Sequence, residues 1–376
     1  MNNKIMIIAG EASGDLHGSG LVKELKAKNS DLHIFGVGGN KMQQQGMELI
    51  YHVNEMSVLG FWDVLKHFRF FKTVYKNLVK KLDHEKPAVL VLIDYPGLNL
   101  KLAKAAHQRG IKVAYYIAPQ VWAWGAKRIK KMSQTVNKMA VIIPFEEKMY
   151  RDAGIDATFV GHPLLEILQI KSNKKEFFAK YGLNPKYKTI GLLPGSRPLE
   201  VKRLLPAMMR TVRQFKRKYL EIQVLIGKAD SVDPEIYNQL IPEKRDVQLL
   251  ENYTYEIMKH SDLLIVASGT ATLESALFET PLIIVYKVDP VSYFIGKQLV
   301  KIDSIGLVNV IAEKKITPEF IQQQFRAENL IPEMENLLFN ENRQSKTIND
   351  LRKIKQKLGE VGASEKAATM ILGMMD

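Results

Sequence analysis

The chain has 376 residues, of which 46% are hydrophobic, and a formal net charge of +14. This length is sufficient for two domains, each with its own core. The sequence contains no cysteine, which excludes disulfide frameworks, cysteine-ligated zinc and thiol nucleophiles. No apolar run approaches the ~20 residues of a membrane-spanning helix, and the N-terminus predicts no signal peptide. We therefore expect a cytoplasmic protein.

The first half of the chain alternates strand and helix patterns. Short apolar runs typical of strands occur at residues 4–9, 33–38, 88–94, 112–118, 139–144 and 157–161. Helical stretches separate most of these runs, which predicts a parallel sheet covered on both faces. The pattern weakens over residues 162–188, where prolines and lysines accumulate as in an interdomain linker.

The same alternation begins again in the second half. Strand-like runs occur at residues 189–194, 222–227, 247–250, 262–268 and 281–286, and charged helical stretches follow from about residue 317. We predict two doubly wound, Rossmann-like α/β domains that face each other across a cleft. The predicted domains are residues 1–165 and 166–345, followed by C-terminal helices at 346–376, for which packing against the N-terminal domain is one option.

The first strand runs into a glycine-rich turn that also carries acidic residues. The stretch IIAGEASGDLHGSG, residues 7–20, lacks G-x-G-x-x-G spacing, and its carboxylates would repel a pyrophosphate. A strand end followed by a helix N-terminus is still typical of a ligand site. The polar residues that suit a hydroxylated ligand or proton transfer are Glu11, Ser13, Asp15 and His17. Alternatively, Ser13 or Asp15 caps the helix and His17 is a surface residue.

Residues 60–82 predict a basic amphipathic helix. Its apolar residues at helical spacing are Leu65, Phe68, Phe71, Tyr75, Leu78 and Leu82. Beside them runs a basic stripe of Arg69, Lys72, Lys76 and Lys80. This composition is typical of a helix that lies on an anionic membrane, with Phe61 and Trp62 as further apolar anchors. The alternative is a surface helix whose apolar stripe packs on the sheet.

Two loops in the second half have the pattern of phosphate sites. Gly195, Ser196 and Arg197 follow one strand and precede a helix, where a tight turn, a helix cap and a guanidinium can hold phosphate oxygens. Another strand is followed by Ser268, Gly269 and Thr270, whose N–H groups can surround an anion. Glu274, one turn further on, would suit the two ribose hydroxyls of a nucleoside. The alternative for Glu274 is a glutamate stabilised by the helix dipole.

Taken in order, these motifs resemble the lipid-A-disaccharide synthase family. They are AGEASGD at 9–15, Asp94 with Pro96 and Asn99, VWAW at 121–124, PFE at 144–146, FVGHP at 159–163, LPGSR at 193–197 and SGTATLE at 268–274. The resemblance covers nearly the whole chain, and Asn309 fits it as well. It implies a cleft of the two-Rossmann type, known as GT-B, with the acceptor and membrane side in the N-terminal domain and the UDP-sugar in the C-terminal domain.

The resemblance also implies the reaction and the partners. A diacylated glucosamine moves from its UDP derivative to the 6-hydroxyl of diacylglucosamine 1-phosphate, lipid X, with inversion and release of UDP. The product is the β-1,6 precursor of lipid A, a step of lipopolysaccharide synthesis. No metal and no cofactor are implied. Such an enzyme would be peripheral on the inner face of the inner membrane, and the sequence leaves open whether it forms a homodimer.

Inversion requires a base for the acceptor hydroxyl. Asp94 ends an apolar strand, where a carboxylate can have a raised pKa, and the resemblance also points to it. Glu11, Asp15 and His17 are rival bases or orienting groups, and a helix cap is the structural alternative for Asp94. Trp122 and Trp124 are expected to pack on the acceptor sugar or acyl chains, unless they belong to the core.

Two other functions remain open from the sequence. A UDP-N-acetylglucosamine 2-epimerase, or another UDP-sugar enzyme, would share the fold. The net charge alone also fits a nucleic-acid-binding protein, but no zinc-finger spacing, RNP-like aromatic pattern or basic low-complexity arm supports this, so we expect no nucleic acid partner.

Overall fold

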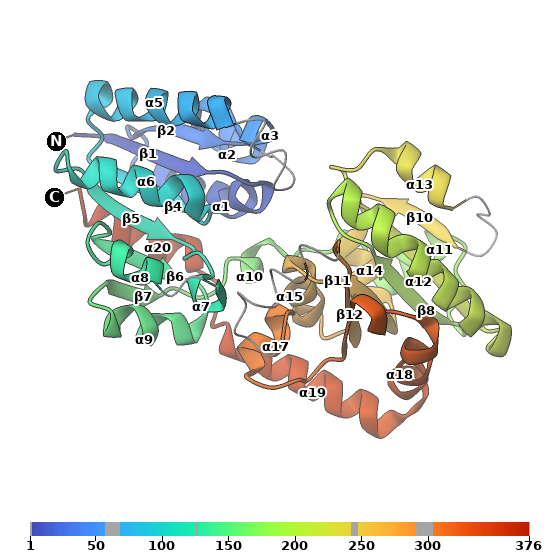
Figure 1. Cartoon of the computed structure of the whole chain (residues 1–376). Helices are drawn as coiled ribbons and strands as arrows, with labels where there is room; N and C mark the ends of the chain where they lie inside the picture. The colour runs from blue at the N-terminus through green and yellow to red at the C-terminus, as the bar shows by residue number, and fades with distance from the viewer. Residues whose placement is uncertain are drawn as a thin grey trace. The chain divides into compact units, whose positions relative to one another are not determined.

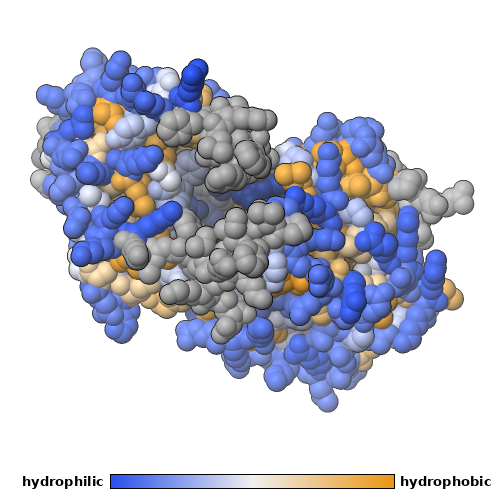
Figure 2. All heavy atoms as spheres, viewed as in Figure 1, coloured by the Kyte–Doolittle hydropathy of each residue, from blue (hydrophilic) through white to orange (hydrophobic). Residues whose placement is uncertain are grey.

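The structure, a computed structural model, describes residues 2–56, 68–124, 127–241, 247–289, 293 and 304–375. The chain forms two compact units, one of Met1–Glu166 with Leu358–Asp376 and one of Ile167–Lys357 (Figure 1). Each unit is a parallel sheet with helices on both faces, so the predicted α/β fold class is confirmed. On the face seen in Figure 2, hydrophilic residues predominate and hydrophobic residues occur in small separate groups.

The first unit is built on a seven-stranded sheet in the order β3-β2-β1-β4-β5-β6-β7. All of its neighbouring strands are parallel. The strands are β1 (Lys4–Ala9), β2 (His33–Gly38), β3 (Glu48–His52), β4 (Val89–Ile93), β5 (Lys112–Tyr116), β6 (Lys138–Val141) and β7 (Asp156–Phe159). The sequence predicted six of them and missed β3, an edge strand whose residues are only partly buried.

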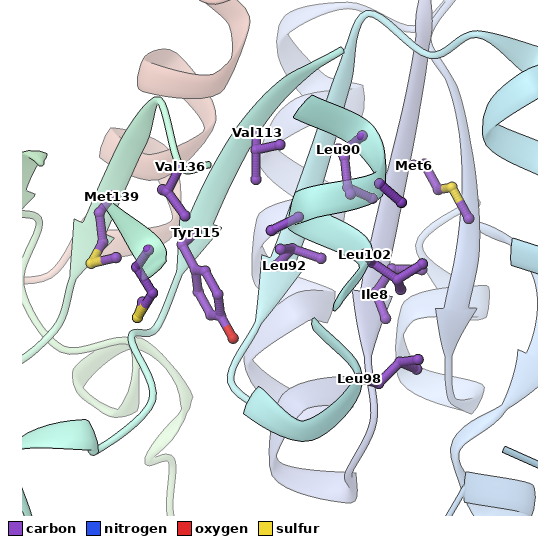
Figure 3. Close-up of a cluster of buried hydrophobic side chains, with 14 of the residues drawn as sticks. Met6, Ile8, Leu90, Leu92, Leu98, Leu102, Val113, Tyr115, Val136 and Met139 are labelled. Atoms are coloured by element: carbon purple, nitrogen blue, oxygen red, sulfur yellow. The ribbon is translucent and has the colours of Figure 1, made fainter. Parts of the chain in front are cut away.

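Helices cover both faces of this sheet. The helices of the unit are α1 (Ala12–Lys28), α2 (Asn40–Gln44), α3 (Val53–Met56), α5 (Phe68–Glu85), α6 (Pro96–His107), α7 (Val121–Trp124), α8 (Lys127–Met132), α9 (Pro144–Asp152) and α20 (Ala363–Leu372), and α10 (Leu164–Ile167) leads into the second unit. Side chains of β1 and β4 alternate between the faces, and Met6, Ile8, Leu90 and Leu92 pack with Leu98 and Leu102 of α6 in one core (Figure 3). The opposite face is covered by α1, against which α20 packs.

Helix α5 tests part of the membrane prediction. Val74, Leu78 and Leu82 are fully buried in the core, and Phe71 and Tyr75 pack against it. The apolar stripe therefore packs on the sheet, which was the alternative reading. The predicted basic stripe, Arg69, Lys72, Lys76 and Lys80, is exposed to solvent. Phe61, Trp62, Leu65 and the side chain of Phe68 lie outside the described residues.

The second unit has a six-stranded sheet in the order β10-β9-β8-β11-β12-β13, again with parallel neighbours. Its strands are β8 (Lys188–Leu193), β9 (Ile222–Lys228), β10 (Gln248–Glu251), β11 (Leu263–Ala267), β12 (Leu282–Tyr286) and β13 (Glu319–Ile321). Its helices are α11 (Lys174–Lys180), α12 (Pro198–Lys218), α13 (Pro234–Leu240), α14 (Thr254–His260), α15 (Thr270–Leu277), α17 (Leu307–Ala312), η2 (Gln322–Gln324), α18 (Ala327–Phe339) and α19 (Glu341–Lys357).

The C-terminal segment is divided between the two units. Helix α19 belongs to the second unit, where it packs on α15 and α18, and the chain returns to the first unit at Leu358. There Lys28 of α1 pairs with Glu365 of α20 at 3.1 Å, and the Glu166 carboxylate accepts the N–H groups of Gly362 and Ser364. The domain boundary predicted at residue 346 lies inside α19, which is one continuous helix over Glu341–Lys357.

Candidate active site

The strand order of the first unit reverses between β1 and β4. From β1 the sheet extends through β2 and β3, whereas β4 to β7 extend it on the other side. Ligands of doubly wound sheets bind beside the carboxyl ends of the strands at such a point. The loop after β1 carries the exposed Glu11 and leads to the half-buried Ser13, and Asp94 directly follows β4. The fold therefore brings predicted site residues from two separate motifs to one edge of the sheet.

Asp94 lies in a strained stretch of backbone that the core supports. Asp94 and Tyr95 are left-handed, with φ of 43° and 47°, a conformation that costs free energy in residues other than glycine. The Asp94 N–H donates to the Ile117 carbonyl at 3.1 Å. The Asp94 carbonyl accepts the Tyr115 hydroxyl at 2.6 Å and the amide of the fully buried Asn99 at 2.8 Å. Asn99, predicted to contact the acceptor, supports this turn from inside the core.

The environment of Asp94 favours proton uptake by its carboxylate. Burial and the nearby charge of Glu11 raise the pKa of Asp94 from 3.8 to about 6, against the opposing effect of a hydrogen bond from the Tyr95 backbone. A carboxylate with this pKa is mostly ionised at neutral pH and more basic than an ordinary aspartate. These are the properties of a general base.

The Asp15 carboxylate is hydrogen-bonded to backbone groups of the first unit. One of its carboxylate oxygens accepts the N–H groups of Gly39 and Met42 at 2.8 and 3.0 Å, and the other accepts the N–H of Lys41 at 3.2 Å. These donors belong to the turn before α2 and to its first residues, so the carboxylate caps that helix. Because both carboxylate oxygens accept backbone N–H groups, we assign a structural role to Asp15.

His17 is buried and faces a second histidine. Burial lowers the pKa of His17 to about 4, so its imidazole is neutral at pH 7. Its ring lies edge-on to that of His162, with the centroids 6.1 Å apart, and its Nδ1 has no hydrogen-bond partner among the described residues. His162 Nδ1 accepts the N–H of Leu164 at 3.2 Å. The alternative interpretation of His17 as a surface residue is wrong, because α1 presents this side chain to the interior.

Trp122 is hydrogen-bonded to a carboxyl group that was not among the predicted site residues. The half-buried Trp122 lies on α7, and its indole Nε1–H donates to Glu146 Oε1 at 3.0 Å. Burial, with a smaller effect of the Asp94 charge, raises the pKa of Glu146 to about 8. Its motif, PFE after an apolar run, was the available signal. The Trp124 side chain lies outside the described residues, as do Phe61 and Trp62.

In the second unit the strand order reverses between β8 and β11, and both predicted phosphate loops follow these strands. Gly195 has φ of 111°, and a Cβ there would lie 2.5 Å from Glu200 Oε2, so the turn requires glycine. Arg197 is the residue before α12, and its Nη1 lies 3.4 Å from Glu200 Oε1. Ser196 is exposed, and its carbonyl accepts the Ser231 hydroxyl at 2.6 Å.

The loop after β11 keeps part of its predicted anion-binding capacity. The N–H of Ser268 donates to the Val285 carbonyl at 3.0 Å, and its hydroxyl donates to the Ile305 carbonyl at 3.1 Å. Ser268 is therefore held by the protein. Gly269 precedes α15 and Thr270 begins it, so their N–H groups lie at the positive end of a helix dipole.

Glu274 lies one turn into α15 and is supported by a tyrosine. The Tyr255 hydroxyl donates to Glu274 Oε1 at 3.3 Å. Burial raises the pKa of Glu274 to about 7, against the opposing effect of this hydrogen bond. The second Glu274 oxygen gives the site an acceptor of the kind that ribose hydroxyls need.

The Asn309 side chain is hydrogen-bonded to other residues of the second unit. Its Nδ2 donates to the Thr317 carbonyl at 2.9 Å and to Glu319 Oε1 at 2.8 Å. Its Oδ1 accepts the N–H groups of Ile316 and Thr317 at 2.9 and 3.0 Å. With both ends of the amide bonded inside the unit, we assign the Asn309 side chain to the fold.

Two kinds of feature are absent from the described residues. Among them, no three His, Asp or Glu side chains are grouped so that they could hold a metal ion. Nor does any helix in this part of the chain have the length and apolar character needed to cross a membrane.

Comparison with known proteins gives a family match over nearly the whole chain. The model of the lipid-A-disaccharide synthetase family matches residues 5–372. A lipid-A-disaccharide synthase of Syntrophus aciditrophicus is 41% identical over 378 residues, covering 100% of this chain and 99% of its own. That of Geobacter metallireducens is 39% identical over 375 residues, covering 100% and 98%. The predicted family resemblance is confirmed.

Solved structures show the same fold at low sequence identity. UDP-GlcNAc 2-epimerase from Neisseria meningitidis, bound to UDP-GlcNAc, has a TM-score of 0.69 at 14% identity, covering 98% of this chain and 100% of its own. The calicheamicin glycosyltransferase CalG4 has a TM-score of 0.63 at 13% identity, covering 100% and 98%. At such identities the likeness concerns the fold alone, and the family match decides between the synthase and the epimerase readings.

Proposed function

This chain belongs to the lipid-A-disaccharide synthase family, and on that premise we propose which of its residues carry out the transfer. The enzyme is a UDP-sugar-dependent glycosyltransferase that joins UDP-2,3-diacylglucosamine to 2,3-diacylglucosamine 1-phosphate and releases UDP. The configuration at the donor C1 inverts, so a single displacement is sufficient. Such a displacement requires a base for the acceptor and stabilisation of the leaving diphosphate.

Asp94 is the base in this proposal. Its carboxylate removes the proton of the acceptor 6-hydroxyl while that oxygen attacks C1 of the donor sugar. The bond from C1 to the phosphate oxygen breaks, and its electron pair leaves with UDP. The observation that carries the assignment is the position of Asp94 after β4, in a backbone turn fixed by Tyr115 and Asn99 and with a pKa raised to about 6.

The rival candidates have environments that suit a base less well. Both carboxylate oxygens of Asp15 accept backbone N–H groups, so proton uptake there would weaken the cap of α2. His17 is buried within the first unit, and its low pKa makes its imidazole a weak base. Glu11 raises the pKa of Asp94 by its charge, which makes it an auxiliary to the base.

The second unit holds the nucleotide in this proposal. The Arg197 guanidinium binds diphosphate oxygens, and the N–H groups at the start of α15 bind others, so the charge that develops on UDP is met by fixed donors. The turn at Gly195 and Ser196 lets the backbone approach the phosphates. The Glu274 carboxylate accepts hydrogen bonds from the ribose hydroxyls, and the hydrogen bond from the Tyr255 hydroxyl fixes the position of this carboxylate.

Because both substrates carry acyl chains, the enzyme must reach them at a membrane. We assign this contact to the exposed basic stripe of α5, Arg69, Lys72, Lys76 and Lys80, at the inner face of the inner membrane. Each such residue near an anionic surface contributes about 1 kcal/mol, so four give reversible binding. Phe61 and Trp62, predicted as apolar anchors, remain part of this proposal, as do Ser13 and Trp124 for the acceptor.

The experiment that tests the proposal separates turnover from nucleotide binding. Asp94→Asn and Asp94→Ala should lower turnover by about 10²–10⁴ and leave the UDP affinity within about twofold of wild type. Glu48→Gln is the matched control, since Glu48 is an exposed acid of the same unit that pairs with His33 on the surface. Turnover near the wild-type level in Asp94→Asn would remove Asp94 from the base role.

A further inference from the structure

The carboxyl group of Glu146 is buried in the first unit, in surroundings that disfavour a negative charge. The residue is 1% exposed and lies in the first turn of α9, just after β6. Oε1 accepts the indole N–H of Trp122 at 3.0 Å. Oε2 is buried and has no hydrogen-bond partner within the described structure. An ionised carboxylate with one buried oxygen left unbonded is costly, whereas a protonated one carries no charge.

The surroundings of Glu146 disfavour its ionised form. Burial, with a smaller effect of the Asp94 charge on the loop after β4, raises its pKa to about 8, against the opposing hydrogen bonds from Trp122 and from the Ile143 backbone. Tyr150, on α9 itself, is buried with a raised pKa, so its hydroxyl stays neutral, and it donates to the Pro119 carbonyl at 3.1 Å. Glu146 is therefore mostly protonated at pH 7.

Trp122 is held at two places and remains partly exposed. Its N–H edge is fixed by Glu146, and its ring meets that of Phe145 in a T-shaped contact with centroids 5.4 Å apart. Phe145 and Glu146 are adjacent residues of α9, so one helix fixes both the position and the tilt of the indole. The indole is half-buried, which leaves part of its surface for a ligand.

We propose that Glu146 is a positioning residue of the acceptor site, and that its buried carboxyl group fixes the Trp122 indole so that the exposed part of the ring packs on the acceptor's glucosamine ring. This proposal rests on the proposed function, because it takes the first unit as the acceptor side. A tryptophan offers a flat apolar surface for a sugar and a polar N–H edge for its anchor. Fixing that edge in advance lowers the ordering cost when the acceptor binds.

The first test needs no substrate. We expect the tryptophan fluorescence of the wild-type protein to change between pH 6 and 9.5 with a midpoint near pH 8, as Glu146 ionises beside the indole. Glu146→Gln and Trp122→Phe should both abolish this transition. Glu147→Gln should keep it, because Glu147 is the next residue of α9 and pairs with Arg151 at 2.9 Å. A transition that persists in Glu146→Gln would overturn the proposal.

The second test separates positioning from chemistry. Glu146→Leu should raise the KM for the acceptor about tenfold and leave the UDP affinity unchanged, since only the indole loses its anchor. Glu146→Gln should restore the KM to within about twofold, because its amide oxygen still accepts the indole N–H. A Glu146→Gln variant as impaired as Glu146→Leu, or a normal KM in Glu146→Leu, would overturn the proposal. Absence of disaccharide synthesis by the wild type would contradict the proposed function alone, since the fluorescence test is independent of the reaction.

Discussion

Replacing Asp94 by asparagine should make the protein more stable at neutral pH while it loses activity. Burial and Glu11 raise the pKa of Asp94 from 3.8 to about 6 in the folded state. Ionisation of Asp94 therefore lowers the free energy of unfolding, which is a penalty for the folded protein. The penalty is absent below pH 4, grows as the pH rises from about 4 to about 6, and is constant above that. A shift of about two pKa units corresponds to about 3 kcal/mol of unfolding free energy.

Asparagine has the same shape as aspartate, tolerates the left-handed backbone at this position and carries no charge. Urea unfolding of wild type and Asp94→Asn at pH 4, 5, 6, 7 and 8 measures the difference. We expect little difference at pH 4 and an advantage for the variant that approaches about 3 kcal/mol by pH 7. An equal difference in stability at pH 4 and pH 7 would refute the reasoning, because the effect would then not come from ionisation of Asp94.

Three further predictions concern the other parts of the site. Arg197→Ala should weaken UDP binding by about tenfold or more in calorimetry, because a charge-assisted hydrogen bond to phosphate is lost. Lys202 is exposed near the start of α12, the helix that follows Arg197, and Lys202→Ala should leave UDP binding unchanged. Equal UDP affinities in both variants would place the phosphates elsewhere. Tyr255→Phe should weaken UDP binding more at pH 7 than at pH 9, because its hydrogen bond lowers the pKa of Glu274 and favours the ionised carboxylate; a loss independent of pH would count against this. Replacing Arg69, Lys72, Lys76 and Lys80 by glutamine should weaken binding to anionic liposomes and slow turnover on membrane-embedded substrate, with a much smaller loss on detergent-solubilised substrate; equal losses in the two assays would contradict the membrane role.

Much of the fold could be predicted from the sequence because buried parallel strands are short apolar runs. Strands such as β4 and β11 are buried along their whole length, and their sequences contain no polar residue. The edge strands β3 and β13 were missed because an edge strand is only partly buried and mixes polar with apolar residues. Helix α5 shows the limit of periodicity, since an apolar stripe has the same spacing whether it meets a sheet or a lipid surface.

The candidate site was predictable as far as its residues follow strands. Asp94 and Arg197 lie where a strand ends and a helix begins, and the fold places such positions at one edge of each sheet. The roles of Asp15 and Asn309 could not be predicted, because their hydrogen-bond partners are backbone groups of other segments. The pairing of Trp122 with Glu146 likewise joins two helices and has no signature in local spacing.

The pH dependence of disaccharide formation by Glu11→Gln, compared with wild type, tests most directly the claim that Asp94 is the base. The assay uses defined donor and acceptor in detergent with a chelator present and follows UDP release. We predict an acidic limb near pH 6 in the wild type, because the protonated Asp94 cannot accept the hydroxyl proton. Removing the Glu11 charge should move that limb to lower pH while the maximal rate stays within about threefold. An unmoved limb would contradict the account, and so would a loss of about 10²-fold or more in Glu11→Gln, since Glu11 would then itself be the base.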